Sequence, residues 1–283
     1  MFKTYYQLAK PGIVYGNALA AIGGFLLASH GHVDLGLFLA MLLGVSLVMA
    51  SGCVYNNYID RGIDKLMSRT DKRVLVTGTV SARSALVYAT ILGLVGICLL
   101  LLTNILTALL GLIGFIAYVV LYGIGKRRTV HGTLIGSISG AIPPVIGYCA
   151  VSGRIDGAAL LLFVILVFWQ MPHFYAIATY RRKDYVAAGL PVLPVKLGMR
   201  VTKVQILVYI VGFVAACTLL TVLGYTGYAY LITMLLVGLY WLSLALPGFK
   251  THDDDRWARK VFGGSLVVLL VFSFMISIDA FLP

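Results

Sequence analysis

The sequence predicts an all-α, polytopic membrane protein with nine transmembrane helices. Three observations support this class: the composition, the lengths of the apolar runs and the placement of the basic residues. Of the 283 residues, 60% are hydrophobic and only 11% are charged, and the mean hydropathy is +0.98. A water-soluble globule of this size has no core large enough to hide so much apolar surface.

Each predicted span is an apolar run of the length that a helix needs to cross about 30 Å of hydrocarbon, roughly 17–25 residues. The nine runs are 12–30, 35–57, 84–103, 105–123, 134–152, 158–179, 204–223, 228–247 and 261–279. Little more than Thr103, at the end of the third run, and Asn104 lies before the fourth run, which predicts a tight helical hairpin there. We expect residues 1–283 to form a single integral membrane domain.

The basic residues predict the orientation of the chain. Of the 22 lysines and arginines, only Arg154 falls on one side of the predicted topology, and the other 21 fall on the opposite side. The positive-inside rule makes the basic side cytoplasmic, with the N-terminus inside and the C-terminus outside. Because only Met1 to Pro11 precede the first span and no cleavage site is evident, a prokaryotic plasma (inner) membrane fits best. This topology and anionic lipid explain the net charge of +12 without a nucleic-acid partner.

A first polar motif follows the second span. Asn56, Asp60 and Asp64 are spaced i, i+4 and i+8, so a helix that continues beyond the membrane carries them on one face, about 6 Å apart. Carboxylate and amide oxygens are ligands for a hard cation, and Mg²⁺ needs few of them when substrate phosphates complete its shell. The alternative is a solvated helix end whose aspartates pair with Arg61 or Lys65.

A second polar stretch, WQMPHFYAIATYRRKDYVAAGLPVLP, closes the sixth span. His173 and Asp184 are eleven residues apart, so they would share a face if the helix continues past Pro172. Aspartates amid basic residues at two helix ends on the same side indicate a site for a metal and a diphosphate. The residues predicted to bind the diphosphate are Arg73, Lys126, Arg127, Arg181 and Lys183.

His173 lies inside a span, where a histidine is costly to bury and is usually functional. Apart from His30 at the very end of the first run, it is the one histidine within a predicted span, which disfavours a cytochrome with two facing histidine ligands. The ionisable residues cluster at one edge rather than near the midplane, which disfavours a transporter. A hydrogen bond from His173 to a neighbouring helix is the alternative to a functional role.

Several segments resemble the UbiA-type superfamily of intramembrane prenyltransferases. NNYIDRGID, residues 56–64, resembles its first motif, N-D-x-x-D-x-x-x-D. Within the superfamily, KPGIVYGN, RVLVTG, GAIPPVIGY and WQMPHFYAIATYRRKDYVAAGLPVLPV are similar to the haem O synthases, and the likeness covers nearly the whole chain. Two positions depart from the wider pattern, Asn57 in the first motif and Ala188 in the second, and both departures fit the haem branch.

The resemblance implies nine transmembrane helices around a central cavity with a cytoplasmic polar cap. It implies transfer of the farnesyl group of farnesyl diphosphate to a vinyl group of haem b, with water addition, giving haem O and diphosphate. The residues expected to be catalytic and to bind Mg²⁺ are Asn56, Asp60, Asp64 and Asp184, and those expected to bind haem are His173, Trp169 and His131. Aromatic side chains, Tyr118 and Tyr122 among them, are candidates to face an allylic cation.

One alternative acceptor is left open. A UbiA-type enzyme of another branch would prenylate 4-hydroxybenzoate or a chlorophyllide, and the W-Q-x-P-H-F segment argues against those branches. Besides the lipid bilayer, haem A synthase or a terminal oxidase is expected as a partner from pathway logic alone. The number of metal ions, the use of a longer prenyl donor and the oligomeric state are not determined by the sequence.

Overall fold

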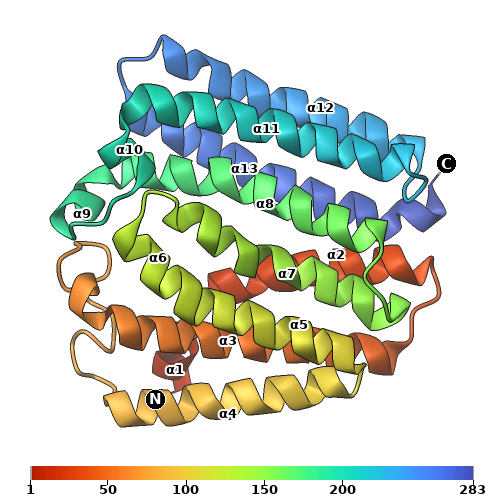
Figure 1. The fold of residues 1–283 in the computed structure, drawn as a ribbon, viewed down its shortest axis with the longest axis horizontal. Helices are drawn as coiled ribbons and strands as arrows, with labels where there is room; N and C mark the ends of the chain where they lie inside the picture. The colour runs from red at the N-terminus through yellow and green to blue at the C-terminus, as the bar shows by residue number, and fades with distance from the viewer. Residues whose placement is uncertain (1, 283) are drawn as a thin grey trace.

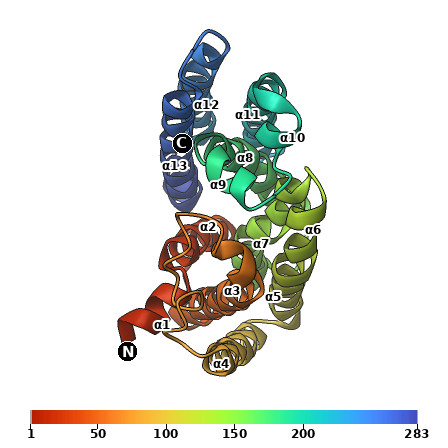
Figure 2. The same cartoon turned by 90° about the vertical axis from the view of Figure 1, so that its left-hand side faces the viewer.

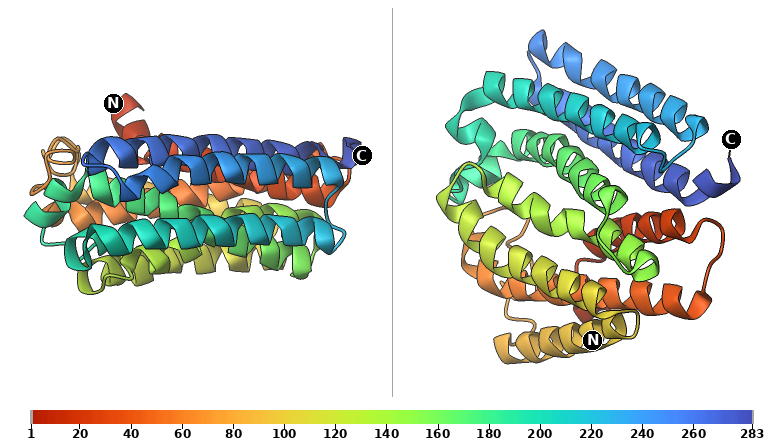
Figure 3. Two further views of the ribbon diagram at one scale, coloured as in Figure 1. Left: turned by 90° about the horizontal axis from the view of Figure 1, so that it is seen from above. Right: turned by 45° about the vertical axis from the view of Figure 1, so that its right-hand side comes forward.

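The computed structural model describes residues 2–282, and this range contains no strand. Nine helices between Phe2 and Leu282 are long and apolar enough to cross a membrane, which confirms the predicted number of spans. They run along the long axis of the molecule, so the connecting segments gather at its two ends (Figure 1 and Figure 3).

The elements follow one another with short connections. The first half of the chain forms α1 (Phe2–Leu8), α2 (Pro11–Ser29), α3 (Leu35–Asp64), α4 (Ala82–Leu101), α5 (Ile105–Ile116), the π-helical segment η1 (Ala117–Tyr122) and α6 (Gly123–Arg128). The second half forms α7 (Gly132–Ser152), α8 (Gly157–Tyr180), α9 (Arg182–Ala187), α10 (Leu193–Lys196), α11 (Gly198–Val222), α12 (Tyr228–Ala245), the 3₁₀ turn η2 (Leu246–Phe249), α13 (Asp254–Ile278) and the 3₁₀ turn η3 (Asp279–Phe281).

The predicted hairpin between α4 and α5 is confirmed, and Asn104 explains how it is held. The Asn104 side chain accepts a hydrogen bond of 3.0 Å from the Thr107 backbone N–H, which caps the start of α5. Its amide nitrogen donates to the Cys149 carbonyl at 2.9 Å. One side chain therefore both begins α5 and ties the hairpin to α7.

Helices α2 and α7 approach each other so closely that only glycine fits at two positions. A Cβ on Gly24 would lie 2.0 Å from the Pro144 carbonyl oxygen, and one on Gly147 would lie 2.0 Å from the Ala21 carbonyl oxygen. Small residues let backbones pack directly in membrane proteins, where association depends on contact rather than on expulsion of water. This contact holds α2 firmly against the middle of the bundle.

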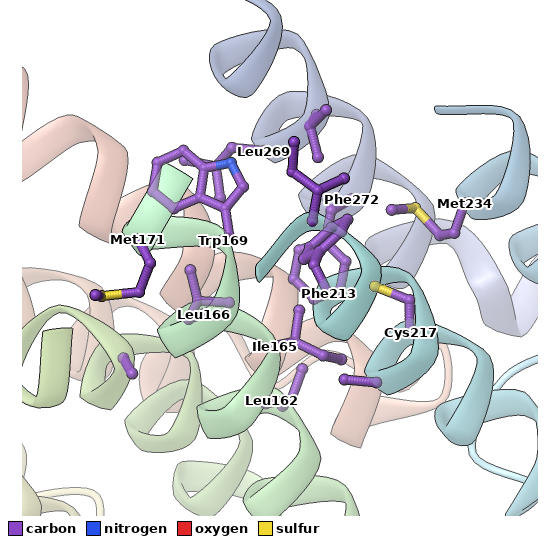
Figure 4. Packing of buried hydrophobic residues seen from close by; sticks show 14 of the residues in the cluster. Leu162, Ile165, Leu166, Trp169, Met171, Phe213, Cys217, Met234, Leu269 and Phe272 are labelled. Carbon is purple, nitrogen blue, oxygen red and sulfur yellow. The ribbon is translucent and has the colours of Figure 1, made fainter. Parts of the chain in front are cut away.

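Two apolar clusters stabilise the bundle on either side of this contact. Figure 2 places α2 to α7 in one part of the molecule and α8 to α13 in the other. Phe213, Trp241 and Phe272 lie at the centre of the second part, all at most 1% exposed, and Figure 4 shows Phe213 and Phe272 packed with their neighbours on α8 and α11. Phe25 and Met41 are fully buried in the first part. The two clusters fix α3 and α8, whose polar ends carry the predicted site.

One end of the bundle carries α1, the segment 65–81, α6 and α9, and we call it the basic end (Figure 2). The predicted diphosphate residues Arg73, Lys126 and Lys183 all lie there, whereas Arg154 lies between α7 and α8 at the opposite end. The grouping of basic residues that the sequence predicts is therefore present in three dimensions. The membrane side that this end faces stays a prediction.

Candidate active site

The first polar motif occupies the last turns of α3, which continues to Asp64 as predicted. Asn56, Asp60 and Asp64 are only 5%, 8% and 2% exposed. The alternative of a solvated helix end is therefore wrong. Arg61 turns away from the motif, because its guanidinium donates to the Tyr58 carbonyl and lies over the Tyr58 ring.

Lys126 joins two members of the motif. Its ammonium donates to the Asn56 side-chain oxygen at 2.8 Å and forms an ion pair with Asp60. Arg127 donates to the other carboxylate oxygen of Asp60 at 3.0 Å and to the Ile59 carbonyl at 2.9 Å. Lys126 and Arg127, which were predicted to bind the diphosphate, therefore contact residues that were predicted to bind the metal.

A π-helical segment precedes Lys126 and aligns an aromatic pair with it. The rings of Tyr118 and Tyr122 are stacked, with centroids 5.8 Å apart and an interplanar angle of 7°. The Lys126 ammonium lies 4.8 Å from the centroid of the Tyr122 ring. Single π turns occur frequently at functional sites. The sequence contained no signal for η1, because its residues are as apolar as those of an ordinary span.

Asp64 is paired by the segment that follows α3. Arg73 donates to the Asp64 carboxylate at 2.7 Å, and the Thr70 hydroxyl donates to the Asp64 carbonyl at 2.9 Å. These contacts fold the segment 65–81 back over the end of α3. The predicted residue Arg73 therefore lies at the motif.

Asp184 reaches the same end of the bundle by a different path from the one predicted. Helix α8 continues past Pro172, as expected, but it ends at Tyr180, and Arg181 has φ −107° and ψ 16°. Asp184 then lies on the short helix α9, so the prediction that it shares one helix face with His173 is wrong. Its carboxylate accepts a hydrogen bond of 2.9 Å from the Ser68 hydroxyl.

The other two predicted diphosphate residues, Arg181 and Lys183, do not pair with the motif in the described part of the chain. Lys183 is exposed, and Arg181 lies over the Tyr180 ring at 5.6 Å from its centroid. Within residues 2–282 neither forms an ion pair. Their assignment to the diphosphate stays a prediction.

One polar contact joins His173 on α8 to Ser265 on α13, and a second joins Trp169 to the same serine. The His173 Nδ1 lies 2.7 Å from the Ser265 hydroxyl, and the Trp169 indole N–H donates to the Ser265 carbonyl at 2.8 Å. The Ser265 hydroxyl donates its single proton to the Phe262 carbonyl at 2.5 Å, so it accepts from His173. Nδ1 therefore carries the proton, and Nε2 keeps a free lone pair.

Aromatic rings fix the plane of the His173 imidazole. The Trp169 ring is stacked on it at 4.8 Å between centroids, and the Phe262 ring lies at 4.9 Å. The hydrogen bond to a neighbouring helix that the sequence left open is thus present on one nitrogen. His131 is exposed at the start of α7, with no side-chain contact to this cluster.

A narrow apolar hollow extends from the motif toward the middle of the bundle, between α3, α5, η1 and α7. Its free volume is about 20 Å³, enough for about one water molecule. Gly52, Tyr118 and Ser139 line the part nearest the motif, and Val45 and Ile146 line the deepest part. Gly52 lies one helical turn before Asn56, so the hollow begins directly beneath the polar site.

The sequence matches the profile of the UbiA prenyltransferase family over residues 17–274. The chain belongs to the UbiA prenyltransferase family. A relative from Sodalis glossinidius named Protoheme IX farnesyltransferase is 56% identical over 286 residues, covering 100% of this chain and 96% of the relative. A relative of the same name from Klebsiella pneumoniae is 54% identical over 285 residues, covering 100% of this chain and 97% of the relative.

Solved structures share the fold of this UbiA-family chain. A structure of digeranylgeranylglyceryl phosphate synthase superposes with a TM-score of 0.81 at 21% identity, covering 99% of this chain and 98% of the other. A UbiA homolog from Archaeoglobus fulgidus bound to GPP and Mg²⁺ superposes with a TM-score of 0.68 at 16% identity, covering 97% and 99%. At these identities the likeness establishes the fold, including the nine-helix arrangement.

The oxygen-bearing side chains of this UbiA-family site suit Mg²⁺ chemically. Asn56, Asp60 and Asp64 offer one amide and two carboxylate groups, and Mg²⁺ typically takes one or two protein carboxylates together with substrate phosphates. Over residues 2–282 no three His, Cys, Asp or Glu side chains form a group that could hold a metal ion by itself. These three side chains therefore suit a metal that binds together with a diphosphate. They do not enclose a metal by themselves.

Sequence reasoning missed two polar residues at this site. Ser68 contacts Asp184, as described above, and nothing in its neighbours distinguishes it from an ordinary loop serine. Lys10 precedes α2 within electrostatic range of Asp60, Asp64 and Arg73, and burial lowers its pKa to about 8 although the two carboxylates raise it. The segment KPGIVYGN contains Lys10, but helix periodicity does not place it near α3.

Proposed function

We propose that this chain transfers the farnesyl group of farnesyl diphosphate to a vinyl group of haem b, with addition of water, to give haem O and diphosphate. The observation that carries the proposal is the 56% and 54% identity, over the full length of the chain, to relatives named Protoheme IX farnesyltransferase. The site described above supplies the groups that this reaction requires.

The basic side chains at the motif are suited to hold the diphosphate of the donor. Arg73, Lys126 and Arg127 each contact a carboxylate of the motif, so their charges are already oriented in a partly buried site. Cations held in place before the reaction stabilise the negative charge that develops on the departing diphosphate. They cost little reorganisation when the carbon–oxygen bond of the donor breaks.

Asn56, Asp60 and Asp64, with Asp184 from α9, are the residues that would hold Mg²⁺ against the diphosphate. When bound, a divalent cation neutralises the charge of the diphosphate leaving group. Lys126, Arg127 and Arg73, which pair with these carboxylates, would contact the phosphate oxygens from the positions they already hold. The solved structure of the Archaeoglobus fulgidus homolog bound to GPP and Mg²⁺ supports this proposal. Titration of the activity with Mg²⁺ tests it.

The apolar tail of the donor is placed in the hollow beneath the motif, whose lining side chains must move apart to admit it. The Tyr118 ring lines this hollow and is stacked on Tyr122, which offers an aromatic face to the carbon that becomes electron-poor. The terminal carbon of a haem vinyl group forms the new bond to the first farnesyl carbon. Water then adds to the other vinyl carbon and releases a proton, which balances the loss of diphosphate.

His173 is proposed as the haem contact, through the Nε2 lone pair. Its other nitrogen is occupied by Ser265, and Trp169 and Phe262 hold the ring plane. A histidine oriented in this way can coordinate the haem iron or accept a hydrogen bond from a polar group. His131 stays the second candidate, at the surface of the basic end.

We propose that the basic end faces the cytoplasm of a prokaryotic inner membrane, with the N-terminus inside and the C-terminus outside. The support is the concentration of Lys and Arg at that end and the lone Arg154 opposite. A membrane enzyme that modifies or receives haem O, such as haem A synthase or a terminal oxidase, is the expected partner.

The test is turnover by the purified chain in detergent or nanodiscs with haem b, farnesyl diphosphate and Mg²⁺. We expect a more hydrophobic haem whose mass has increased by one farnesyl group and one hydroxyl group. A matched reaction replaces haem b by 4-hydroxybenzoate. Prenylated 4-hydroxybenzoate without any modified haem would overturn the proposal in favour of the alternative acceptor.

A further inference from the structure

Lys10 has an unusual backbone conformation. It lies between α1 and α2 with φ 54° and ψ 65°, in the left-handed region. This region is unfavourable for a residue with a Cβ, and the residue before a proline, here Pro11, ordinarily adopts an extended conformation. Within residues 2–282 only Lys10 and His30 are non-glycine residues with positive φ. Such a residue persists only where its surroundings impose the conformation, frequently at a functional site.

The Lys10 side chain is half-buried and makes no direct contact with a counterion in the described range. The structure has five half-buried lysines and arginines in its described range, namely Lys10, Arg73, Lys126, Arg181 and Lys203. Arg73, Lys126 and Lys203 each pair with an aspartate, and Arg181 lies over a tyrosine ring. No hydrogen bond, ion pair or ring contact joins the Lys10 ammonium to another residue between Phe2 and Leu282. A cation withdrawn from water without a partner is costly, so an anion is expected beside it.

The start of α2 is tied to the polar end of α3. The Asn57 side-chain amide donates to the Leu8 carbonyl at 2.9 Å, two residues before Lys10. Leu8 itself is buried in an apolar cluster with Val54 and Leu75. These contacts hold the α1–α2 junction against the face that carries Asp60 and Asp64, and they account for the proximity of Lys10 to both carboxylates.

The charges around the motif leave a positive surplus. Arg73, Lys126 and Arg127 pair with Asp60 or Asp64, and Lys10 interacts electrostatically with both carboxylates. With Asp184 included, four positive charges face three carboxylates, and Lys10 is the cation that no carboxylate contacts. A bound anion offsets this surplus, and a diphosphate is such an anion.

We propose that Lys10 is a donor-binding residue whose ammonium contacts the diphosphate of the prenyl donor from the α1–α2 junction, while Lys126 and Arg127 contact it from α6. The inference rests on the proposed function for the identity of the anion. The half-buried ammonium, its interaction with both carboxylates and the tie from Asn57 to Leu8 are the observations that place it at the motif.

The experiment measures binding of inorganic diphosphate and of farnesyl diphosphate, by calorimetry without any acceptor, to the full chain in nanodiscs. We expect Lys10→Met to weaken both by about 10- to 100-fold, the effect of losing one charge-assisted hydrogen bond, and to leave haem binding unchanged. Lys10→Arg should restore part of the affinity. Lys3→Met, which removes an exposed charge on α1, is the matched control and should change neither.

A second variant separates the charge from the backbone. Glycine adopts the left-handed conformation without strain, so Lys10→Gly should keep a Tm at least as high as that of Lys10→Met and bind diphosphate equally poorly. Diphosphate affinity within twofold of the unaltered chain, in either variant, would overturn the proposal. Because no acceptor is present, a failure of haem to react in the turnover assay is a separate result and contradicts only the proposed function.

Discussion

Arg73 folds back over Asp64, so that a guanidinium nitrogen lies 2.7 Å from a carboxylate nine residues earlier in the chain. The Asp64 side chain is 3% exposed and that of Arg73 is 27% exposed. Removing the arginine therefore leaves a buried carboxylate without its partner. We expect Arg73→Met to lower the free energy of unfolding by about 2–4 kcal/mol, because breaking a buried pair strands a charge.

Denaturant unfolding in a fixed detergent measures this effect. The matched control is Arg61→Met, whose guanidinium contacts only Tyr58 and whose loss should be nearly neutral. The double variant Arg73→Met/Asp64→Asn should recover much of the lost stability, since the stranded charge is removed. Equal destabilisation by Arg61→Met and Arg73→Met would contradict this account of the pair.

Asp60 is the residue on which both cations of α6 converge, and its carboxylate is a proposed metal ligand. We expect Asp60→Asn to reduce kcat by at least about 100-fold, as for loss of a principal electrostatic contact in a reaction that expels an anion. The steady-state rate is measured with saturating donor over a range of Mg²⁺ concentrations. The control is Asp71→Asn, an exposed aspartate in the segment 65–81. Full activity of Asp60→Asn at low Mg²⁺ would refute the metal proposal.

Val45 lies at the deep end of the apolar hollow and is 1% exposed. A larger side chain there shortens the space for the donor tail without touching the polar site. We expect Val45→Phe to raise KM for farnesyl diphosphate about tenfold or more, the effect of displacing two or more buried methylenes. Geranyl diphosphate, which is one isoprene unit shorter, should be affected much less. Equal losses for both donors would show that the tail lies elsewhere.

Ser265 determines which nitrogen of His173 carries a proton. Ser265→Ala removes the acceptor of the Nδ1 proton, so the imidazole can rotate or exchange its tautomer. We expect weaker haem binding, followed as a change in the Soret absorption on titration with haem b, and unaltered binding of diphosphate. Ser265→Thr should retain haem binding, because the hydroxyl is kept. A parallel loss of haem and diphosphate binding would instead indicate general disruption of α13.

The pKa of Lys10, lowered to about 8 by burial, predicts a pH dependence of donor binding. The groups that face it are Asp60 and Asp64, which raise its pKa, Arg73, which lowers it, and Cys53. The Lys10 ammonium is fully charged well below pH 8, and it loses its proton and its charge as the pH rises through about 8. Diphosphate affinity should therefore fall between about pH 7 and about pH 9. The Lys10→Met variant should lack this fall.

Stability of the chain without substrate should change in the opposite sense. The unfolded lysine titrates near 10.5, so the unfolded state binds more protons than the folded state between about pH 8 and pH 10.5. Stability therefore rises with pH over that window, because the cost of a buried ammonium is removed. Comparison of Tm against pH for the unaltered chain and Lys10→Met measures the difference. A steeper decline of the unaltered chain with rising pH would contradict the assigned burial.

The nine spans and the polar face of α3 could be predicted because both depend on local properties. The length of an apolar run decides whether it crosses the membrane, and helix periodicity alone places Asn56, Asp60 and Asp64 on one face. Both predictions required only neighbours within a few residues. For the same reason, the sequence could predict that aspartates and cations gather at one end of the bundle.

The pairing of those charges was decided only by the tertiary structure. Lys126 contacts Asp60 across 66 residues of chain, and this contact depends on how α3, η1 and α7 pack, which no local pattern encodes. The break at Arg181 and the left-handed Lys10 likewise have no local signal, and the Lys10 conformation is one that a lysine by itself disfavours. The sequence thus determined which helices exist and which faces are polar, and the packing of those helices decided which side chains meet.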